Sequence, residues 1–222
     1  MNDLVPALQE SLFSSAFETI GSDLLEIGID SILHDGLLKD IPIVSTILGA
    51  GKVAQNVHDR NLAKQTAAFV NTFRTQGITS TEIEKHVEKL LNSSKLLEQE
   101  LGRVLIMLNE NIDVVKSVYE AKFYAAFVKQ HILWEDFCEL CDITKRLFVS
   151  DIRKLKEAFI NGGVKDGMKL TYQYERLISV GLLTNEARLS GGGIFIDMDD
   201  TEPTMLLELS PVGEMFCNII WK

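Results

Sequence analysis

The sequence predicts a mainly α-helical protein, in which a multi-helix bundle is followed by a small C-terminal α+β unit laid out like a winged helix. Three observations support this fold class. Apolar residues recur every three or four positions along most of the chain, as one face of an α-helix requires. No long alternating strand pattern interrupts these segments. The strand-like runs come only after a glycine-rich break at residues 160–167.

The bulk composition is that of a globular protein. The 222 residues are 46% hydrophobic and 24% charged, so the chain is long and apolar enough to bury a sizeable core. The formal net charge of −10 argues against general binding to nucleic acid or to an anionic lipid surface. The first residues lack the basic and apolar regions of a secretory signal, and we therefore expect a cytoplasmic protein.

The first helix is expected from Leu4 to about Leu33, with Gly21 as the expected position of a break. Residues 1–50 contain eight acidic residues and one lysine, so this segment is strongly anionic. The apolar positions that define its helical face are Leu4, Leu8, Leu12, Ala16, Ile20, Leu24 and Ile27.

A second helix is expected to begin at Pro42 and to run to about Phe73, because proline is harmless in a first helical turn. The next helix has two alternative capping boxes, Thr79 with Glu82 or Thr81 with Glu84. Further helices are predicted at about 80–92, 95–109, 112–130, 134–148 and 150–160.

The break at residues 160–167, "INGGVKDG", predicts a division into a helical bundle at 1–161 and a winged-helix-like domain at 162–222. The second domain is expected to contain a helix within residues 168–183 that Gly181 ends. Strands at 194–198 and 205–209 would form a hairpin, and residues 210–221 would form a closing amphipathic segment.

The stretch from Lys39 to Arg60 contains "GAGK", which invites comparison with a phosphate-binding loop. That motif needs a glycine where Thr46 stands and a hydroxyl residue where Val53 stands, so nucleotide binding is not expected. We interpret the stretch as a helix with a small-residue face for packing or for partner contact. Its candidate residues are Ile41, Pro42, Ile47, Gly49, Gly51, Lys52, Asp59 and Arg60.

The same stretch has a membrane alternative. The uncharged run at 41–51 covers 11 residues, whereas a spanning helix needs about 20. A simple transmembrane segment is therefore excluded, but an effector that releases residues 41–57 onto a membrane stays open as a hypothesis.

No catalytic or metal-binding constellation is evident. Cys138 and Cys141 lack the second ligand pair that structural zinc requires, and Cys217 leaves an odd number of thiols. The four histidines, His34, His58, His86 and His131, lie in no recognisable catalytic motif. We therefore expect no enzymatic activity, no cofactor, no metal and no small-molecule substrate.

A winged helix often binds DNA through a helix in the major groove. Residues 181–222, however, contain seven acidic residues and two basic ones, which repel phosphate. The preceding residues 151–176 are mildly basic, and their candidate nucleic-acid contacts are Arg153, Lys154 and Lys156. Nucleic acid is thus the less favoured partner.

The C-terminal pattern, "YERLISVGLL" followed by "LELSPVGEMF", resembles the tail of the abortive-infection alpha family of bacterial proteins. Ser210 stands where that family usually has threonine. The positions that match the family pattern are Leu177, Gly181, Leu182, Leu183, Leu209, Ser210, Gly213 and Phe216.

A second resemblance concerns helical proteins found in bacterial phage-defence contexts. The sequence pattern of these proteins has an earlier and a later portion, and residues 41–70 of this chain resemble the earlier one. The matching residues there are Ile41, Pro42, Lys52, Asp59, Arg60, Lys64 and Phe69. Residues 134–155 are similar to the later portion. These resemblances imply a non-enzymatic component of anti-phage defence that acts through a protein partner or as a homo-oligomer. The alternatives are the membrane-disrupting effector and a DNA-binding regulator.

Overall fold

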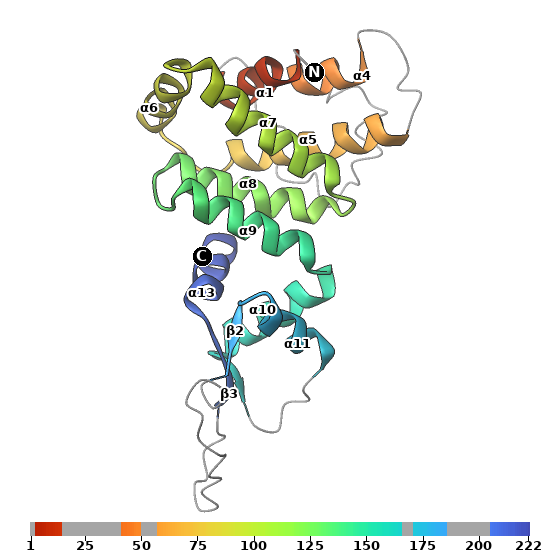
Figure 1. Cartoon of the computed structure of the whole chain (residues 1–222), viewed down its shortest axis with the longest axis vertical. Coiled ribbons are helices and arrows are strands. Elements are labelled where there is room, and N and C mark those ends of the chain that lie inside the picture. The colour runs from red at the N-terminus through yellow and green to blue at the C-terminus, as the bar shows by residue number, and fades with distance from the viewer. Residues whose placement is uncertain (1–2, 15–40, 50–56, 166–170, 186–204) are drawn as a thin grey trace, which may run out of the picture. The chain divides into compact units, whose positions relative to one another are not determined.

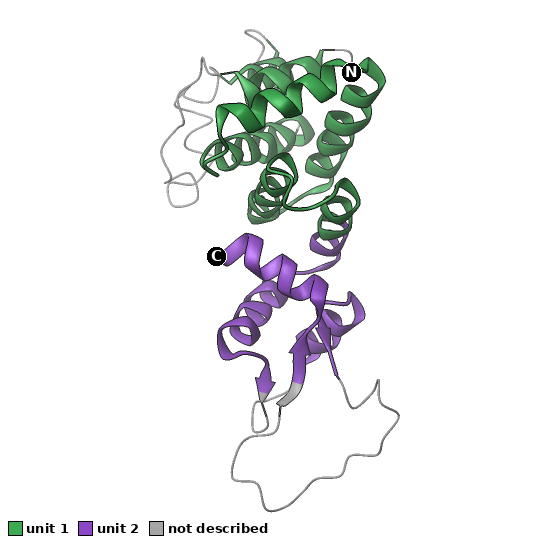
Figure 2. Ribbon diagram, turned by 90° about the vertical axis from the view of Figure 1, so that its left-hand side faces the viewer, with its two compact units in different colours: residues 1–141 green, residues 142–222 purple. Residues whose placement is uncertain are grey.

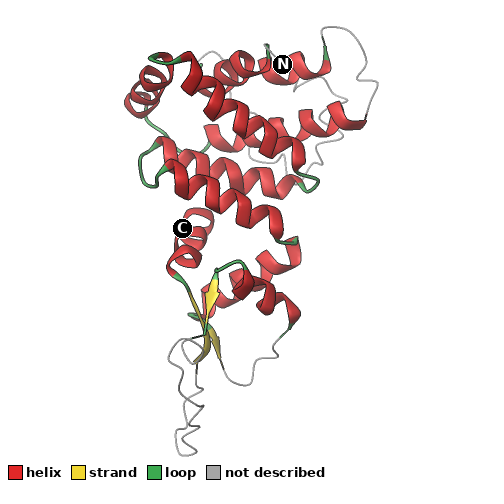
Figure 3. Ribbon diagram, viewed as in Figure 1, coloured by secondary structure: helices red, strands yellow, loops and turns green. Residues whose placement is uncertain are grey.

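The computed structural model describes residues 3–14, 41–49, 57–165, 171–185 and 205–222 (Figure 1). These residues are mainly helical, with ten helices and three short strands, which confirms the predicted fold class (Figure 3). The chain divides into two compact units, residues 1–141 and 142–222 (Figure 2).

The first unit is built from helices. Those described are α1 (Leu4–Phe13), α4 (Pro42–Leu48), α5 (Val57–Arg74), α6 (Ser80–Leu91), α7 (Ser94–Glu110), α8 (Val114–Val128) and the first part of α9 (Trp134–Arg146). Helices α6 to α9 begin and end within two residues of their predicted bounds. The capping box that forms is Thr79 with Glu82, in which each residue's side chain bonds the other's backbone N–H.

Helix α1 is shorter than predicted. It ends at Phe13, because Ser14 has an extended backbone with ψ 137°, and the Ser14 carbonyl accepts a hydrogen bond from the Arg74 side chain. The prediction of one helix continuing towards Leu33 is therefore wrong at Ser14. The remainder of that prediction, including the break at Gly21, lies outside the described residues.

The helix predicted from Pro42 to Phe73 begins where expected, but the segment contains two helices and not one. Pro42 occupies the first turn of α4 as expected. The helix ends at Leu48, because Gly49 has φ 70° and ψ 131°, a conformation that glycine adopts readily and an α-helix cannot contain. Helix α5 begins at Val57, and residues 50–56 lie outside the described part of the chain.

Helix α5 packs along α8, and the aromatic core of the first unit forms around this contact. Phe69 and Phe73 of α5 lie against Tyr124 of α8, with ring centroids 5.8 and 5.5 Å apart. Phe137 of α9 packs against Tyr124 from another side, at 5.5 Å. All four rings are fully buried, so this cluster supplies much of the apolar stabilisation of the unit.

The second unit contains the remaining elements in the order helix, strand, helix, strand, strand, helix. They are α10 (Val149–Asn161), β1 (Val164–Lys165), α11 (Tyr172–Ser179), β2 (Leu183–Thr184), β3 (Met205–Leu209) and α13 (Pro211–Trp221). Strand β3 lies between β1 and β2 and is antiparallel to both, so the sheet order is β1-β3-β2. The predicted strand at 205–209 is confirmed, whereas the one at 194–198 lies outside the described residues.

The division between the units falls between Cys141 and Asp142 and not at the predicted position after residue 161. The reason is the packing of α10, which contacts α11, β3 and α13. Helix α10 therefore belongs to the C-terminal unit. Gly162 and Gly163, which follow it, form a turn between α10 and β1 within that unit.

Several residues of the C-terminal segment, among them Gly181, Leu182 and Ser210, make structural contacts in the second unit. Gly181, with φ 80°, follows α11, and the Leu182 N–H bonds the Leu177 carbonyl as in a Schellman motif. Ser210 caps α13 by accepting a bond from the Gly213 N–H. These residues join α11, the sheet and α13 into one unit.

Candidate functional site

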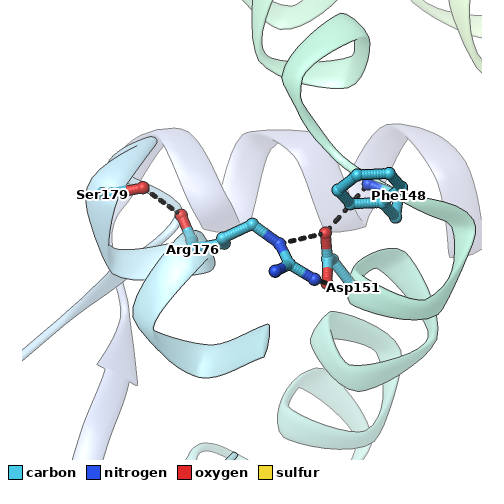
Figure 4. Close-up of polar contacts among 4 residues, drawn as sticks. All are labelled: Phe148, Asp151, Arg176 and Ser179. Carbon is cyan, nitrogen blue, oxygen red and sulfur yellow. Dashed lines mark hydrogen bonds and ion pairs between the residues drawn. The ribbon is translucent and has the colours of Figure 1, made fainter. Parts of the chain in front are cut away.

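Arg176 on α11 and Asp151 on α10 form the best-defined ion pair of the second unit (Figure 4). Arg176 donates from Nε to Asp151 Oδ2 at 2.9 Å and from Nη2 to Oδ1 at 2.6 Å. Asp151 Oδ2 also accepts the Phe148 backbone N–H at 2.8 Å. A fully buried carboxylate is tolerated here because it lies in the first turn of α10 and both its oxygens are bonded.

Two aromatic rings lie close to the guanidinium group of Arg176. Its Cζ atom lies 4.9 Å from the ring centroid of Phe148 and 4.8 Å from that of Tyr172. The side chains of these two residues are nevertheless exposed, at 62% for Phe148 and 66% for Tyr172. The hydrogen bonds that Arg176 donates to Asp151 raise the pKa of Arg176, so the group stays cationic. Phe148 and Tyr172 thus form an exposed aromatic surface around the charged side chain of Arg176, and we call these three residues the aromatic surface.

The candidate nucleic-acid contacts all lie on α10 but do not form one continuous basic face. Lys154 Nζ is 2.5 Å from Glu157 Oε2, and Lys156 Nζ lies 6.0 Å from the ring centroid of Trp221. Arg153 is exposed and lies about 100° around the helix from Lys154. On α11, the helix that a winged helix would present to DNA, the one cation is Arg176, which already binds Asp151.

The candidate packing segment is divided between α4, α5 and residues outside the description. Ile41, Pro42 and Ile47 are partly buried around α4, while Gly49 ends that helix and is exposed. Asp59 and Arg60 lie in the first turn of α5, and the His58 Nδ1 atom is 3.7 Å from Asp59 Oδ1. Gly51 and Lys52 lie outside the described residues.

The buried face of α4 consists of Ile43 and Val44, which the sequence reading did not single out. Both are fully buried, and α4 packs against α1 and α5. The Ile43 N–H donates to Ser11 Oγ at 3.0 Å, so a side chain of α1 satisfies a free amide at the start of α4. This face is part of the core of the first unit.

The three cysteines form no disulfide bond. Cys141 and Cys217 are buried, and burial raises the pKa of Cys217 to about 12, which disfavours the reactive thiolate. Among the described residues, no three His, Cys, Asp or Glu side chains come together as metal ligands do. Of the four histidines, His58 and His131 are exposed, and His34 lies outside the description.

The fourth histidine, His86, belongs to a buried polar cluster. His86 Nε2 on α6 is 2.8 Å from Glu100 Oε1 on α7, and the Tyr124 hydroxyl on α8 donates to the same oxygen at 2.7 Å. Phe13 and Phe127 pack on the imidazole at 5.7 and 5.3 Å. Burial and the Glu100 carboxylate raise the pKa of Tyr124 well above its usual value, so the phenol stays protonated as a donor.

A second buried cluster joins α5, α8 and the connection before α8. Asn111 Nδ2 donates to Glu120 Oε2 at 2.7 Å and to Ser117 Oγ at 3.0 Å, and Ser117 Oγ donates to Gln65 Oε1 at 2.7 Å. Burial raises the pKa of Glu120 to about 8, despite the opposing effect of the Asn111 bond. Sequence reasoning missed both clusters, although each contains a carboxylate on an otherwise apolar helix face.

Comparison of the chain with family models, with curated proteins and with solved structures gave no match. Of the helices in the described part of the chain, none is both long and apolar enough to cross a membrane. The functional argument therefore rests on the residues of this chain.

Proposed function

We propose that the chain is a non-enzymatic, protein-binding component of a bacterial anti-phage defence system of the abortive-infection type. The observation that carries the protein-binding part is the exposed pair Phe148 and Tyr172, held around Arg176. Aromatic residues and arginine are enriched at protein interfaces and at their energetic hot spots. The defence context is taken from the resemblances described above.

The geometry of this surface favours binding because its parts are already ordered. The two bonds to Asp151 hold the guanidinium group, and its Cζ atom lies 4.9 Å from the ring centroid of Phe148 and 4.8 Å from that of Tyr172. A partner that covers Phe148 and Tyr172 would therefore immobilise few additional side-chain rotations. Such preorganisation lowers the entropic cost of association, by roughly 0.5–1.5 kcal/mol for each side chain that needs no further ordering.

The two alternatives have less support. A DNA-binding role would need free cations on α11, where Arg176 is committed to Asp151. A membrane-disrupting role would need to extract Ile43 and Val44 from the core and to break the bond from Ile43 N–H to Ser11. The aromatic surface needs no such rearrangement to meet a partner.

The proposal is tested by expressing the chain in a phage-sensitive bacterium and measuring phage plating. The intact chain should lower plating, and the double variant Phe148→Ala/Tyr172→Ala should restore it. Ile160→Ala is the matched control, because Ile160 is also a large exposed apolar residue of the second unit. It should behave like the intact chain. Normal plating with the intact chain would refute the defence role, and full restriction by the double variant would refute the aromatic surface.

Two further measurements separate the alternatives. Binding to a DNA duplex that falls steeply with salt, and that Arg153→Glu weakens, would favour the DNA-binding regulator. Dye release from anionic liposomes that Ile47→Asp abolishes would favour the membrane effector. We expect neither response.

A further inference from the structure

A groove lies between α1 and α6 in the first unit, well separated in sequence from the aromatic surface of the second. Its volume is about 390 Å³. The described residues that line it come from one face of α1, from Ser14 immediately after it, and from one face of α6. They are Pro6, Gln9, Glu10, Phe13, Ser14, Ile83, Glu84 and Val87.

The floor and walls of this groove are largely apolar. Phe13 forms part of the lining and is itself supported from the core by Phe73 and His86, at ring distances of 5.8 and 5.7 Å. On α6, Ile83 and Val87 are four residues apart and share a face. Leu91 lies four residues further on and is 64% exposed. The stripe therefore continues for about 12 Å along α6, a length that suits a helix better than a small molecule.

The two charged side chains among the described lining residues are both acidic. Glu10 of α1 and Glu84 of α6 are both exposed and line opposite walls, and Glu88 is exposed one turn beyond Glu84. The described lining residues include no lysine or arginine. An apolar occupant with acidic residues at its edges would be repelled, whereas one with basic edges would be attracted.

We propose that this groove binds an amphipathic α-helix of a partner protein, with apolar residues on one face and lysine or arginine on both sides of that face. Amphipathic helices are commonly bound in this way, with anchors at every third or fourth position inserted into an apolar groove. Ile83, Val87 and Phe13 contact the apolar face, and Glu10 and Glu84 pair with the flanking cations. This inference does not depend on the proposed defence role or on the aromatic surface.

The first experiment uses the full chain and two fluorescently labelled helical peptides. One is built from leucine and lysine, with the leucines on a single face, and the other carries glutamate in place of every lysine. The lysine peptide should bind at least about tenfold more tightly, as measured by fluorescence anisotropy. Equal affinities, or no binding of the lysine peptide, would overturn the proposal.

The second experiment locates the binding, because a protein of net charge −10 attracts cationic peptides in general. The double variant Glu10→Lys/Glu84→Lys should weaken binding of the lysine peptide at least about tenfold. Glu98→Lys/Glu139→Lys makes the same change in net charge at two exposed positions outside the groove, and it should have an effect of less than about twofold. Equal weakening by the two double variants would overturn the proposal. Thermal melts would confirm that both variants fold.

Hydrogen exchange supplies a readout that does not depend on charge. The lysine peptide should slow amide exchange in α1 and α6 of the intact chain. Protection confined to other helices would overturn the proposal. The oligomeric state of the protein without peptide should be the same before and after Glu10→Lys/Glu84→Lys. If this double variant dissociates an oligomer and the intact protein binds no peptide, the proposal is overturned, since a second copy of the chain is then the occupant of the groove.

Discussion

Each unit contains a buried carboxylate that accepts hydrogen bonds from neighbouring side chains, but the partners of that carboxylate are buried in the first unit and partly exposed in the second. In the first unit, Glu100 is buried with His86 and Tyr124 among aromatic rings, and every member of the cluster is inaccessible to solvent or nearly so. In the second unit, the buried carboxylate of Asp151 bonds to Arg176, whose side chain is 31% exposed. The first arrangement defines how three helices pack, and the second holds a surface.

This difference has an energetic consequence. Breaking a buried polar cluster leaves groups that neither protein nor water can satisfy, and the unfolding free energy falls accordingly. Arg176 is partly exposed, so a substitution that keeps its positive charge still leaves a cation beside the buried Asp151 carboxylate, and the cost is smaller. Substitutions in the buried cluster of the first unit should therefore change stability, while a charge-conserving one at Arg176 should chiefly change what the surface can bind.

The largest expected effect concerns two glycines, one in each unit. A Cβ atom on Gly213 would lie 2.0 Å from the Leu182 carbonyl oxygen, whereas one on Gly102 in α7 would have nothing within 4 Å. Gly213→Ala should lower the unfolding free energy of the second unit by about 4 kcal/mol, since backbone must move. Gly102→Ala should raise that of the first unit by roughly 0.5–1 kcal/mol.

Hydrogen exchange resolved by residue would assign each glycine effect to its unit. A Gly213→Ala protein with unchanged protection in α11 and α13 would contradict the close packing against Leu182. Destabilisation by Gly102→Ala would contradict the open space at that position in α7.

The next effect is in the buried cluster of the first unit. Glu100→Ala removes the acceptor that His86 and Tyr124 share, and it should cost about 3 kcal/mol in urea denaturation. Tyr124→Phe removes one hydrogen bond without leaving the carboxylate unpaired, and it should cost about 1 kcal/mol. Similar costs for the two variants would show that the cluster does not act as a connected network.

The pH dependence of the first unit provides the third prediction. The pKa of Glu120 is about 8 in the folded protein, which is above its unfolded value, so the folded state holds the proton more tightly. The resulting stability is fully present below the unfolded pKa and is lost as the pH rises through the folded value. Between pH 6 and 8 the unfolding free energy should fall by on the order of 2 kcal/mol.

Glu120→Gln is the control for this titration, because glutamine keeps the shape and the carbonyl acceptor for Asn111 but does not ionise. Urea denaturation of this variant at several pH values should lack the decline between pH 6 and 8. A decline equal to that of the intact protein would mean that another group is responsible.

The parts of the fold that follow from local sequence were predictable. Pro42 and Gly181 each act through neighbours in the chain, and each lies where it was predicted. Of the two capping boxes that the sequence left open, the one formed by Thr79 and Glu82 is present. Helix ends that depend on distant contacts were not predictable. The carbonyl of Ser14 accepts a hydrogen bond from Arg74, 60 residues away, and no local sequence pattern predicts that contact.

The short strands were also hard to predict. Strands β1 and β2 are two residues long, too short to leave a period-two pattern, and the sequence indicated only β3 of the three.

The candidate sites likewise depend on contacts between residues that are distant in the sequence. The aromatic surface depends on Phe148, Asp151 and Arg176, which the packing of α10 on α11 brings together. Glu100 did leave a signal, because it shares a helix face with the buried Val104 and Leu108.

A small loss of stability, and the sharpest test of the contrast between the units, is expected for Arg176→Lys. Lysine keeps the positive charge but cannot form both bonds to Asp151, and it has no planar guanidinium group to present to the rings of Phe148 and Tyr172. The second unit should remain folded and lose about 1 kcal/mol in urea denaturation, whereas restriction of phage plating should weaken as much as with Phe148→Ala/Tyr172→Ala. Full restriction by a folded Arg176→Lys protein would mean that the rings bind without an ordered guanidinium group. A loss of several kcal/mol would instead place this ion pair among the core interactions, as in the first unit.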